Sequence, residues 1–325
     1  MRWVVLLFLV TSLGVKAQEP PAWFSESLLD LREDVAEAAA QGKRVMLYFG
    51  QDGCPYCKRL MEVNFSQAAI AAKARHRLVA LALNIWGDRE VTWTDGAVTT
   101  EKRLAASLKV QFTPTLLFLD ERGGVALRLN GYLPPHHFDL AMDYVAEKVD
   151  GKVAFAEYLR GRVKDPANAQ LNPQPFFVPA PYDLRRRAGG KPLAVLFETT
   201  SCAQCDELHA VAFRRPQVLR ELSHFDVARF ALSDKAPLTS PQGKVLPAAD
   251  WAHALRVGYV PTMVLFDARG REVLRTEAYL RPFHVAGALE YVSSGAYRGE
   301  PSFQRFLQAK AERMRERGER VDLWE

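Results

Sequence analysis

The fold of this chain is decided by Gln51-Asp52-Gly53-Cys54-Pro55-Tyr56-Cys57-Lys58-Arg59-Leu60, which follows the apolar run Val45-Met46-Leu47-Tyr48-Phe49. This order predicts a buried strand, a tight turn and a helix that opens on two cysteines. Unpaired N–H groups and the macrodipole at a helix N-terminus favour a thiolate, which is the form that attacks disulfides. We therefore expect Cys54 to be the attacking thiol and Cys57, on nearly the same helical face, to be the resolving one.

A proline marks the next informative stretch. The apolar strand expected over 115–119 is entered through Thr113-Pro114 and is followed by a turn at Gly123-Gly124. A proline that enters a central strand is anomalous unless it lies at the strand's edge or carries a cis bond. Thioredoxin-like folds place a cis-proline beside a Cys-x-x-Cys pair, so the combination of Pro114 with Cys54 and Cys57 resembles a thioredoxin domain. The pair alone is less specific, because the same spacing also supplies half of a zinc site.

The second half of the chain repeats the first. Cys202 and Cys205 follow the apolar run Leu193-Ala194-Val195-Leu196-Phe197, and Cys202 lies 148 positions after Cys54. Val260-Pro261 follows Thr113-Pro114 at an offset of 147. Two unrelated domains would not keep one offset across a strand, a turn and a helix start. We predict an α/β chain of two tandem thioredoxin-like domains, each with a central mixed sheet flanked by helices.

The order of segments can also be predicted. The N-terminal residues combine a basic Arg2 with an apolar stretch that is too short to span a bilayer, which indicates a secretory signal, with an uncleaved anchor as the alternative. We expect the protein to be exported to the periplasm. The predicted segments are a signal peptide over 1–17, a first domain over 22–164, a Pro-rich linker over 165–192, a second domain over 193–299 and a C-terminal helical tail over 300–325.

Charge and cysteine usage narrow the function. The formal net charge is +5, and removal of Arg2 and Lys16 with the signal lowers it by two, so the balance gives no argument for nucleic acid. We expect a soluble mature protein with no stable membrane insertion. All four cysteines belong to the two pairs. In an exported protein with no other cysteine, this favours redox chemistry over structural disulfides. No cofactor is expected.

A closer resemblance rests on the Asn84-Ile85-Trp86-Gly87-Asp88 stretch, on the Cys-Pro-Tyr-Cys motif, on Phe112-Thr113-Pro114-Thr115 and on Gly131-Tyr132-Leu133-Pro134. Together these resemble the SoxW-type periplasmic thioredoxins found with sulfur-oxidation systems. The resemblance implies thiol–disulfide exchange, with Cys54 and Cys57 in the redox positions and Pro114 in the cis-proline position. It implies protein disulfide and thiol clients, and a membrane thiol reductase is the electron donor that we consider.

The client is expected to meet both proline loops. Thr113 and Val260 would contribute backbone groups to an extended peptide that pairs as an added strand, and the prolines after them would shape the groove. The residues that we assign to client binding are Thr113, Pro114, Val260, Pro261, Pro55 and Tyr56.

The two cysteine pairs differ in their surroundings. Lys58 and Arg59 follow the first pair and favour a thiolate, whereas Asp206 and Glu207 follow the second pair and oppose it. We therefore expect the second domain to be the poorer nucleophile, acting as a relay or in substrate binding. Cytosolic thioredoxins carry a buried aspartate six residues before the first cysteine of their pair. At this position the two repeats have Tyr48 and Leu196.

Reductase or relay duty in a reducing pathway is the function that the resemblance favours, and disulfide isomerase or oxidase activity is the alternative within the class. Outside it, Cys202 and Cys205 with His209, four residues further on, form a conceivable copper or zinc module. We otherwise read His209 as a surface residue. His136, His137 and His284 are expected to be capping or surface residues, and no metal ligand is assigned.

Overall fold

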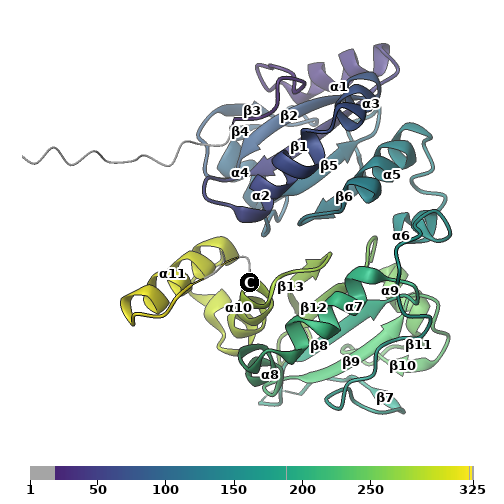
Figure 1. Cartoon of the computed structure of the whole chain (residues 1–325), viewed down its shortest axis with the longest axis vertical. Coiled ribbons are helices and arrows are strands. Elements are labelled where there is room, and N and C mark those ends of the chain that lie inside the picture. Colours follow the sequence, from purple (N-terminus) through teal and green to yellow (C-terminus); the bar gives the residue numbers. More distant parts are fainter. Residues whose placement is uncertain (1–18, 188, 322, 324–325) are drawn as a thin grey trace, which may run out of the picture.

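The computed structural model describes residues 19–187, 189–321 and 323, so the predicted signal peptide lies outside the described residues. Two halves lie one above the other in Figure 1, the N-terminal half at the top and the C-terminal half below it. Among the residues described, no helix has both the length and the apolar character needed to cross a bilayer.

The first repeat contains α1 to α6. Its elements are α1 (Leu31–Ala40), β1 (Arg44–Gly50), α2 (Pro55–Arg59), the π-helical turn η1 (Leu60–Phe65), α3 (Ala68–Arg77), β2 (Leu78–Asn84), β3 (Glu90–Thr92), β4 (Val98–Thr100), α4 (Glu101–Ser107), β5 (Thr115–Leu119), β6 (Val125–Asn130), α5 (Pro135–Ala146) and α6 (Phe155–Leu159).

The central sheet of the first repeat has the strand order β2-β1-β5-β6. β1 pairs in parallel with β2 and antiparallel with β5, and all of its residues are buried. A strand covered on both faces needs a continuous apolar run, which is what the sequence supplies. Alternate β1 residues point to opposite faces: Leu47 packs with residues of α1 and α4, and Met46 packs with residues of α3 and α5.

The second repeat contains β7 to α11. Its elements are β7 (Tyr182–Asp183), β8 (Leu193–Glu198), α7 (Ala203–Ala210), the 3₁₀ turn η2 (Ala212–Arg214), α8 (Pro216–Leu222), β9 (Asp226–Ala231), β10 (Pro237–Thr239), β11 (Val245–Pro247), α9 (Ala248–Ala254), β12 (Thr262–Phe266), β13 (Glu272–Glu277), α10 (Pro282–Ser293), the 3₁₀ turn η3 (Ala296–Arg298) and α11 (Phe303–Glu316). The sheet order β13-β12-β8-β9 reproduces that of the first repeat. The predicted α/β fold with two mixed sheets is therefore confirmed.

Two short sheets lie outside the two central sheets. In the first repeat, β3 forms an antiparallel hairpin with β4 and buries Val91. Within 165–192, β7 pairs in parallel with β10. Strands of two or three residues are too short to show a period, and their backbone pairing leaves no mark in the sequence. The helix predicted to open on the first two cysteines ends as α2 at Arg59 and continues as η1.

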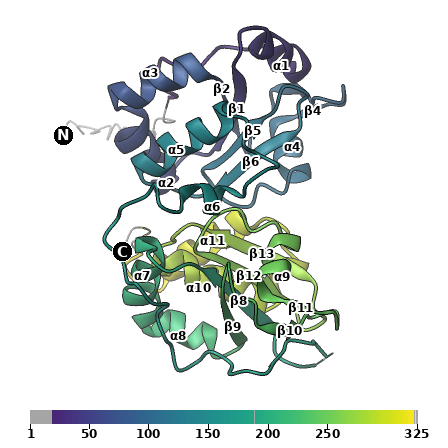
Figure 2. The same cartoon turned by 90° about the vertical axis from the view of Figure 1, so that its right-hand side faces the viewer.

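One hydrophobic cluster extends through both repeats, and the repeats contact each other through equivalent residues. Phe303 at the start of α11 packs against Phe112 of the first repeat, with ring centroids 5.0 Å apart. Phe155 at the start of α6, 148 positions earlier, stacks on Tyr259 of the second repeat. Figure 2 shows α6 at the junction of the two halves. Each repeat therefore extends its last helix over the other repeat.

Candidate functional site

Both cysteine pairs are closed as disulfides at the start of a helix. Cys54 caps α2 and joins Cys57, and Cys202 caps α7 and joins Cys205, each with 5.2 Å between the Cα atoms. In both pairs the backbone N–H of the second cysteine donates to the sulfur of the first over 3.1 Å. This bond places a donor beside the sulfur that would carry negative charge after reduction, and so favours the thiolate.

A cis-proline loop accompanies the disulfide in each repeat. The Thr113-Pro114 and Val260-Pro261 peptide bonds are cis, and the sequence predicted this for Pro114. The Cys54 sulfur lies 3.3 Å from the backbone oxygen of Thr113. The structure thus brings together the loop and the first pair. In the second repeat Val260 and Cys202 border the same cavity, whose volume is about 90 Å³.

The two sites differ in exposure. Cys54 and Thr113 are 7% and 6% exposed, whereas Cys202 and Val260 are half-buried. Beside the first pair, α11 contacts the neighbouring loops through Gln304, whose side chain donates to the backbone oxygen of Gln111 over 2.9 Å and accepts from Gln51 over 2.7 Å. The equivalent contact in the second repeat is a backbone bond from Ala156 to Gly258, also 2.9 Å long.

Comparison with known proteins fits this geometry. The model of the thioredoxin-like domain family matches residues 31–146 and 185–293, which together exceed half of the chain. The chain belongs to the thioredoxin-like domain family. A search of curated proteins gives no significant match.

Solved thioredoxin structures resemble parts of this thioredoxin-like protein. A thioredoxin-fold protein from Helicobacter pylori is 23% identical over 39% of this chain and 85% of its own, with a TM-score of 0.31. A thioredoxin from Thermus thermophilus is 28% identical over 38% of this chain and 90% of its own, also with a TM-score of 0.31. The periplasmic thioredoxin SoxS from Paracoccus pantotrophus is 18% identical over 33% of this chain and 99% of its own, with a TM-score of 0.24.

Tyr56, between the first two cysteines, lies in the interface between the thioredoxin-like domains. Its hydroxyl oxygen accepts a 2.8 Å bond from the backbone N–H of Arg281 and lies 3.4 Å from Nδ1 of His284. Tyr56 is 4% exposed, and its burial raises the pKa of the phenol. Tyr56 therefore meets α10 of the second repeat in this structure, while Pro55 beside it stays half-buried.

The acidic residues after the second pair are engaged by other groups. Asp206 accepts hydrogen bonds from the backbone and side-chain amides of Asn168 and from the side chain of Asn172. Glu207 pairs with Arg281 over 3.4 Å. Because these donors offset part of the negative charge, the electrostatic difference expected between the two pairs is smaller than the sequence alone indicates.

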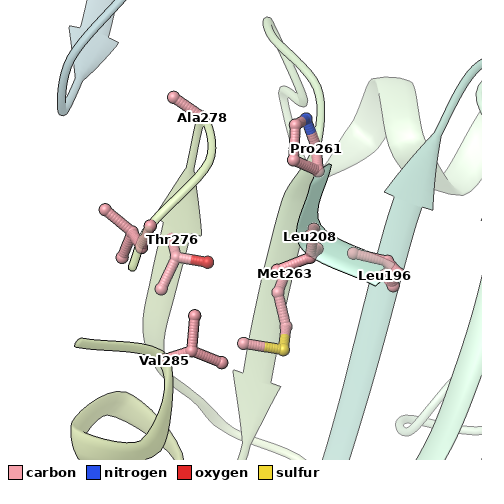
Figure 3. A pocket seen from close by; sticks show the side chains of 8 residues that line it. Leu196, Leu208, Pro261, Met263, Thr276, Ala278 and Val285 are labelled. Carbon is pink, nitrogen blue, oxygen red and sulfur yellow. The ribbon is translucent and has the colours of Figure 1, made fainter. Parts of the chain in front are cut away.

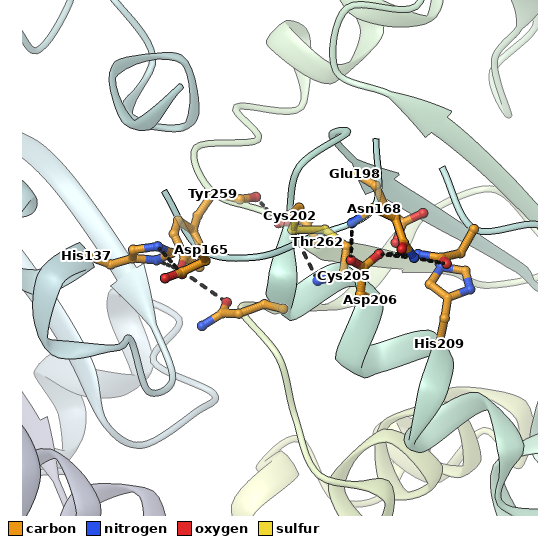
Figure 4. Close-up of a disulfide and its surroundings, with 12 residues drawn as sticks. His137, Asp165, Asn168, Glu198, Cys202, Cys205, Asp206, His209, Tyr259 and Thr262 are labelled. Atoms are coloured by element: carbon orange, nitrogen blue, oxygen red, sulfur yellow. Dashed lines mark hydrogen bonds and ion pairs between the residues drawn. A yellow bond between two sulfur atoms is a disulfide. The ribbon is translucent and has the colours of Figure 1, made fainter. Parts of the chain in front are cut away.

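A buried Glu198–His209 pair lies beside the second disulfide, and the sequence reasoning missed it. Figure 4 shows the two side chains next to Cys205. Nε2 of His209 is 2.9 Å from Oε1 of Glu198, and Nδ1 is 3.0 Å from the Gln174 amide nitrogen. Because the Gln174 amide donates to Nδ1, Nε2 carries the proton and donates it to Glu198.

The expectation that His209 is a surface residue was therefore wrong, since His209 is 3% exposed. Its two nitrogens are both engaged, which removes support for a metal site of His209 with Cys202 and Cys205. The signal in the sequence was the acidic end of an otherwise apolar β8 strand together with a histidine on the buried face of α7. Counting six residues back from Cys202 did not reveal the carboxylate, because Glu198 lies only four residues before it.

The position six residues before the first cysteine of each pair holds no carboxylate in either repeat. Leu196 lines a cavity of about 10 Å³ with Leu208, Pro261 and Met263 (Figure 3). In the first repeat Tyr48 occupies the equivalent strand position, and its hydroxyl fills the space that a side chain at Gly50 would need. Gly50 is the counterpart of Glu198, so the two repeats fill the space behind the disulfide with different chemistry.

Two histidines predicted to be capping or surface residues are buried between the domains. His137 on α5 and His284 on α10 are 8% and 9% exposed, and they are equivalent at an offset of 147. Desolvation lowers the pKa of each to about 4, so both are neutral near pH 7. The prediction failed because their burial depends on the partner repeat, which covers the start of each helix.

Proposed function

We propose that this protein is an exported thiol–disulfide oxidoreductase that reduces, or relays electrons to, protein disulfides in the periplasm. The observation that carries the proposal is the repeated site, in which a disulfide at the start of a helix lies beside a cis-proline loop. The SoxW-type resemblance suggests sulfur-oxidation proteins as the client class. A membrane thiol reductase is the proposed electron donor.

The chemistry assigns one role to each sulfur of the first pair. The Cys54 thiolate attacks a client disulfide, forms a mixed disulfide and releases one client thiolate. The Cys57 thiolate then attacks the Cys54 sulfur and releases the second client thiolate, so that two electrons pass to the client and the Cys54–Cys57 disulfide forms. A donor dithiol reverses these steps and resets the protein. Cys202 and Cys205 exchange in the same way.

The difference in exposure supports a relay. In this structure Cys202 borders a cavity. The loops beside Cys54 are held by contacts with Gln304 of α11. A partner thiol therefore reaches the second pair first, and the first pair reacts after α11 moves away from the Gln111 loop. The second pair therefore comes first in the relay, because a partner thiol can reach it without a movement of α11. Cys54 attacks clients directly only after α11 has moved away.

The test is the redox potential of each pair in single-pair variants, namely Cys54→Ser with Cys57→Ser and Cys202→Ser with Cys205→Ser. Each variant is titrated with glutathione or dithiothreitol and read by thiol alkylation and mass. A potential near about −270 mV supports the reductase, whereas one near about −120 mV would make the protein an oxidant. If neither pair titrates reversibly, the oxidoreductase proposal is wrong.

A further inference from the structure

A cluster outside the disulfide chemistry lies where α5, the segment after α6 and the second cis-proline loop meet. Nε2 of His136 is 2.9 Å from Oδ2 of Asp165, and Nε2 of His137 is 3.6 Å from the same oxygen. One donor atom from each of the three residues lies within 4.8 Å of the other two. Figure 4 shows His137 and Asp165 on one side of the second disulfide and His209 on the other.

The spacing of these donors suits a metal ion. Zinc binds histidine nitrogen and carboxylate oxygen at about 2.0–2.2 Å, so neighbouring donors of a tetrahedral site lie about 3.3 Å apart. The two nitrogen-to-oxygen distances fall on either side of that value. Two imidazoles and one carboxylate form a donor set that suits first-row transition ions, zinc among them.

The hydrogen bonds around His137 prepare its free nitrogen for such an ion. The Tyr259 hydroxyl donates to the side-chain oxygen of Gln204 over 3.1 Å, so it accepts from Nδ1 of His137 over 2.5 Å. Nδ1 therefore carries the proton, and the Nε2 lone pair is bare. This nitrogen is buried and has no hydrogen-bond partner among the described residues. A hydrogen bond of this kind at the other ring nitrogen fixes the tautomer of histidine ligands.

The other repeat supplies an internal contrast. The counterparts of His136 and His137 at the 147-residue offset are Phe283 and His284, so the second repeat lacks one of the two imidazoles. The cluster therefore does not follow from the shared fold. Among the residues that the structure describes, it occurs on the side where a cavity of about 90 Å³ is bordered by His137, Asp165 and Cys202.

We infer that His136, His137 and Asp165 form a binding site for a divalent transition ion such as zinc, with a fourth position open to the cavity beside Cys202. The ion would link α5, the segment after α6 and, through Tyr259, the second cis-proline loop. A cation there would also favour the Cys202 thiolate after reduction, because opposite charge stabilises the ionised thiol. The site goes beyond the proposed redox function and does not depend on it.

The test uses the untagged protein with both disulfides closed, so that no thiol is free to bind metal. Zinc binding is measured by calorimetry, and cobalt is added as a spectroscopic probe of the ligands. We expect one equivalent of zinc and a cobalt spectrum without a sulfur charge-transfer band. His136→Gln and Asp165→Asn should each weaken zinc binding at least tenfold, and Tyr259→Phe should weaken it about 10- to 100-fold.

The matched control is His76→Gln, which removes an exposed histidine on α3 and should leave zinc binding unchanged. His136 is half-exposed, so His136→Gln tests the ligand without disturbing the buried interface. Failure of the oxidised protein to bind zinc, or wild-type affinity in either ligand variant, would overturn the site. Either result would leave the oxidoreductase proposal standing, because that proposal is tested by the redox potentials of the metal-free protein.

Discussion

Asn130 donates a 2.6 Å hydrogen bond to Glu277, the residue that occupies its own position in the other repeat. Both residues end the last strand of their sheets, and both are 7% exposed. Burial raises the pKa of the Glu277 carboxyl group. The two repeats therefore meet through equivalent residues, in the manner of a symmetric dimer whose subunits are joined in one chain.

The Asn130–Glu277 contact should stabilise the interface between the repeats. Asn130→Ala removes the amide donor from a buried carboxyl group, which keeps only its 3.7 Å ion pair with Arg275 among the described residues, and should cost about 1–3 kcal/mol in the free energy of unfolding, measured by urea denaturation. Asn130→Asp should cost more, because it places a second carboxyl group against the first. Adding Glu277→Gln to Asn130→Asp should restore stability, and a double variant as unstable as Asn130→Asp would contradict this explanation.

His284 should make stability fall at acid pH. Its pKa is about 4 in the folded protein and about 6.5 when unfolded, so the unfolded state binds more protons between these values. The contribution is complete above about pH 6.5 and is lost as the pH falls toward 4. We expect a loss of about 2 kcal/mol from this group between pH 7.5 and pH 5, measured from urea transitions.

The His284→Gln variant should show a smaller loss over the same pH interval, because the amide does not titrate. His76→Gln, which changes an exposed histidine, serves as the control and should keep the wild-type pH dependence. Identical pH dependence in all three proteins would assign the acid sensitivity to other groups.

Gln304 should limit access to the first disulfide. Gln304→Ala removes two hydrogen bonds, one to the Gln111 backbone oxygen and one from the Gln51 side chain, that each contribute about 1 kcal/mol, so α11 should leave the Gln111 loop about 30-fold more often. The rate at which dithiothreitol reduces Cys54–Cys57, measured in the Cys202→Ser, Cys205→Ser background, should rise by the same factor. Gln308→Ala, on the exposed face of α11, is the control. Equal rates in the two variants would show that α11 does not control access.

His209 should be needed to keep Glu198 buried. His209→Met introduces the residue found at the equivalent Met61 and leaves a buried carboxylate without its donor, which should cost about 3–5 kcal/mol of unfolding free energy. Adding Glu198→Gln removes the charge and should recover part of that loss. A His209→Met protein as stable as the wild type in urea would mean that the pair contributes nothing to stability.

The sequence by itself determined the local chemistry and the repetition. Cys54 and Cys202, each after a continuous apolar run, gave the strand, turn and helix around both disulfides, because a central strand and a helix start have short-range patterns. The cis bond at Pro114 was also predicted. The constant offset between the halves gave the tandem architecture.

Only the tertiary structure decided how the halves meet. Burial of Tyr56, His137 and His284 depends on the partner repeat, and no local pattern records which surface another domain will cover. The Glu198–His209 pair and the approach of Asp165 to His136 likewise join residues from separate segments. Such contacts join segments that lie apart in the sequence. Each of these polar residues, taken alone, is of a type that is usually found at the protein surface.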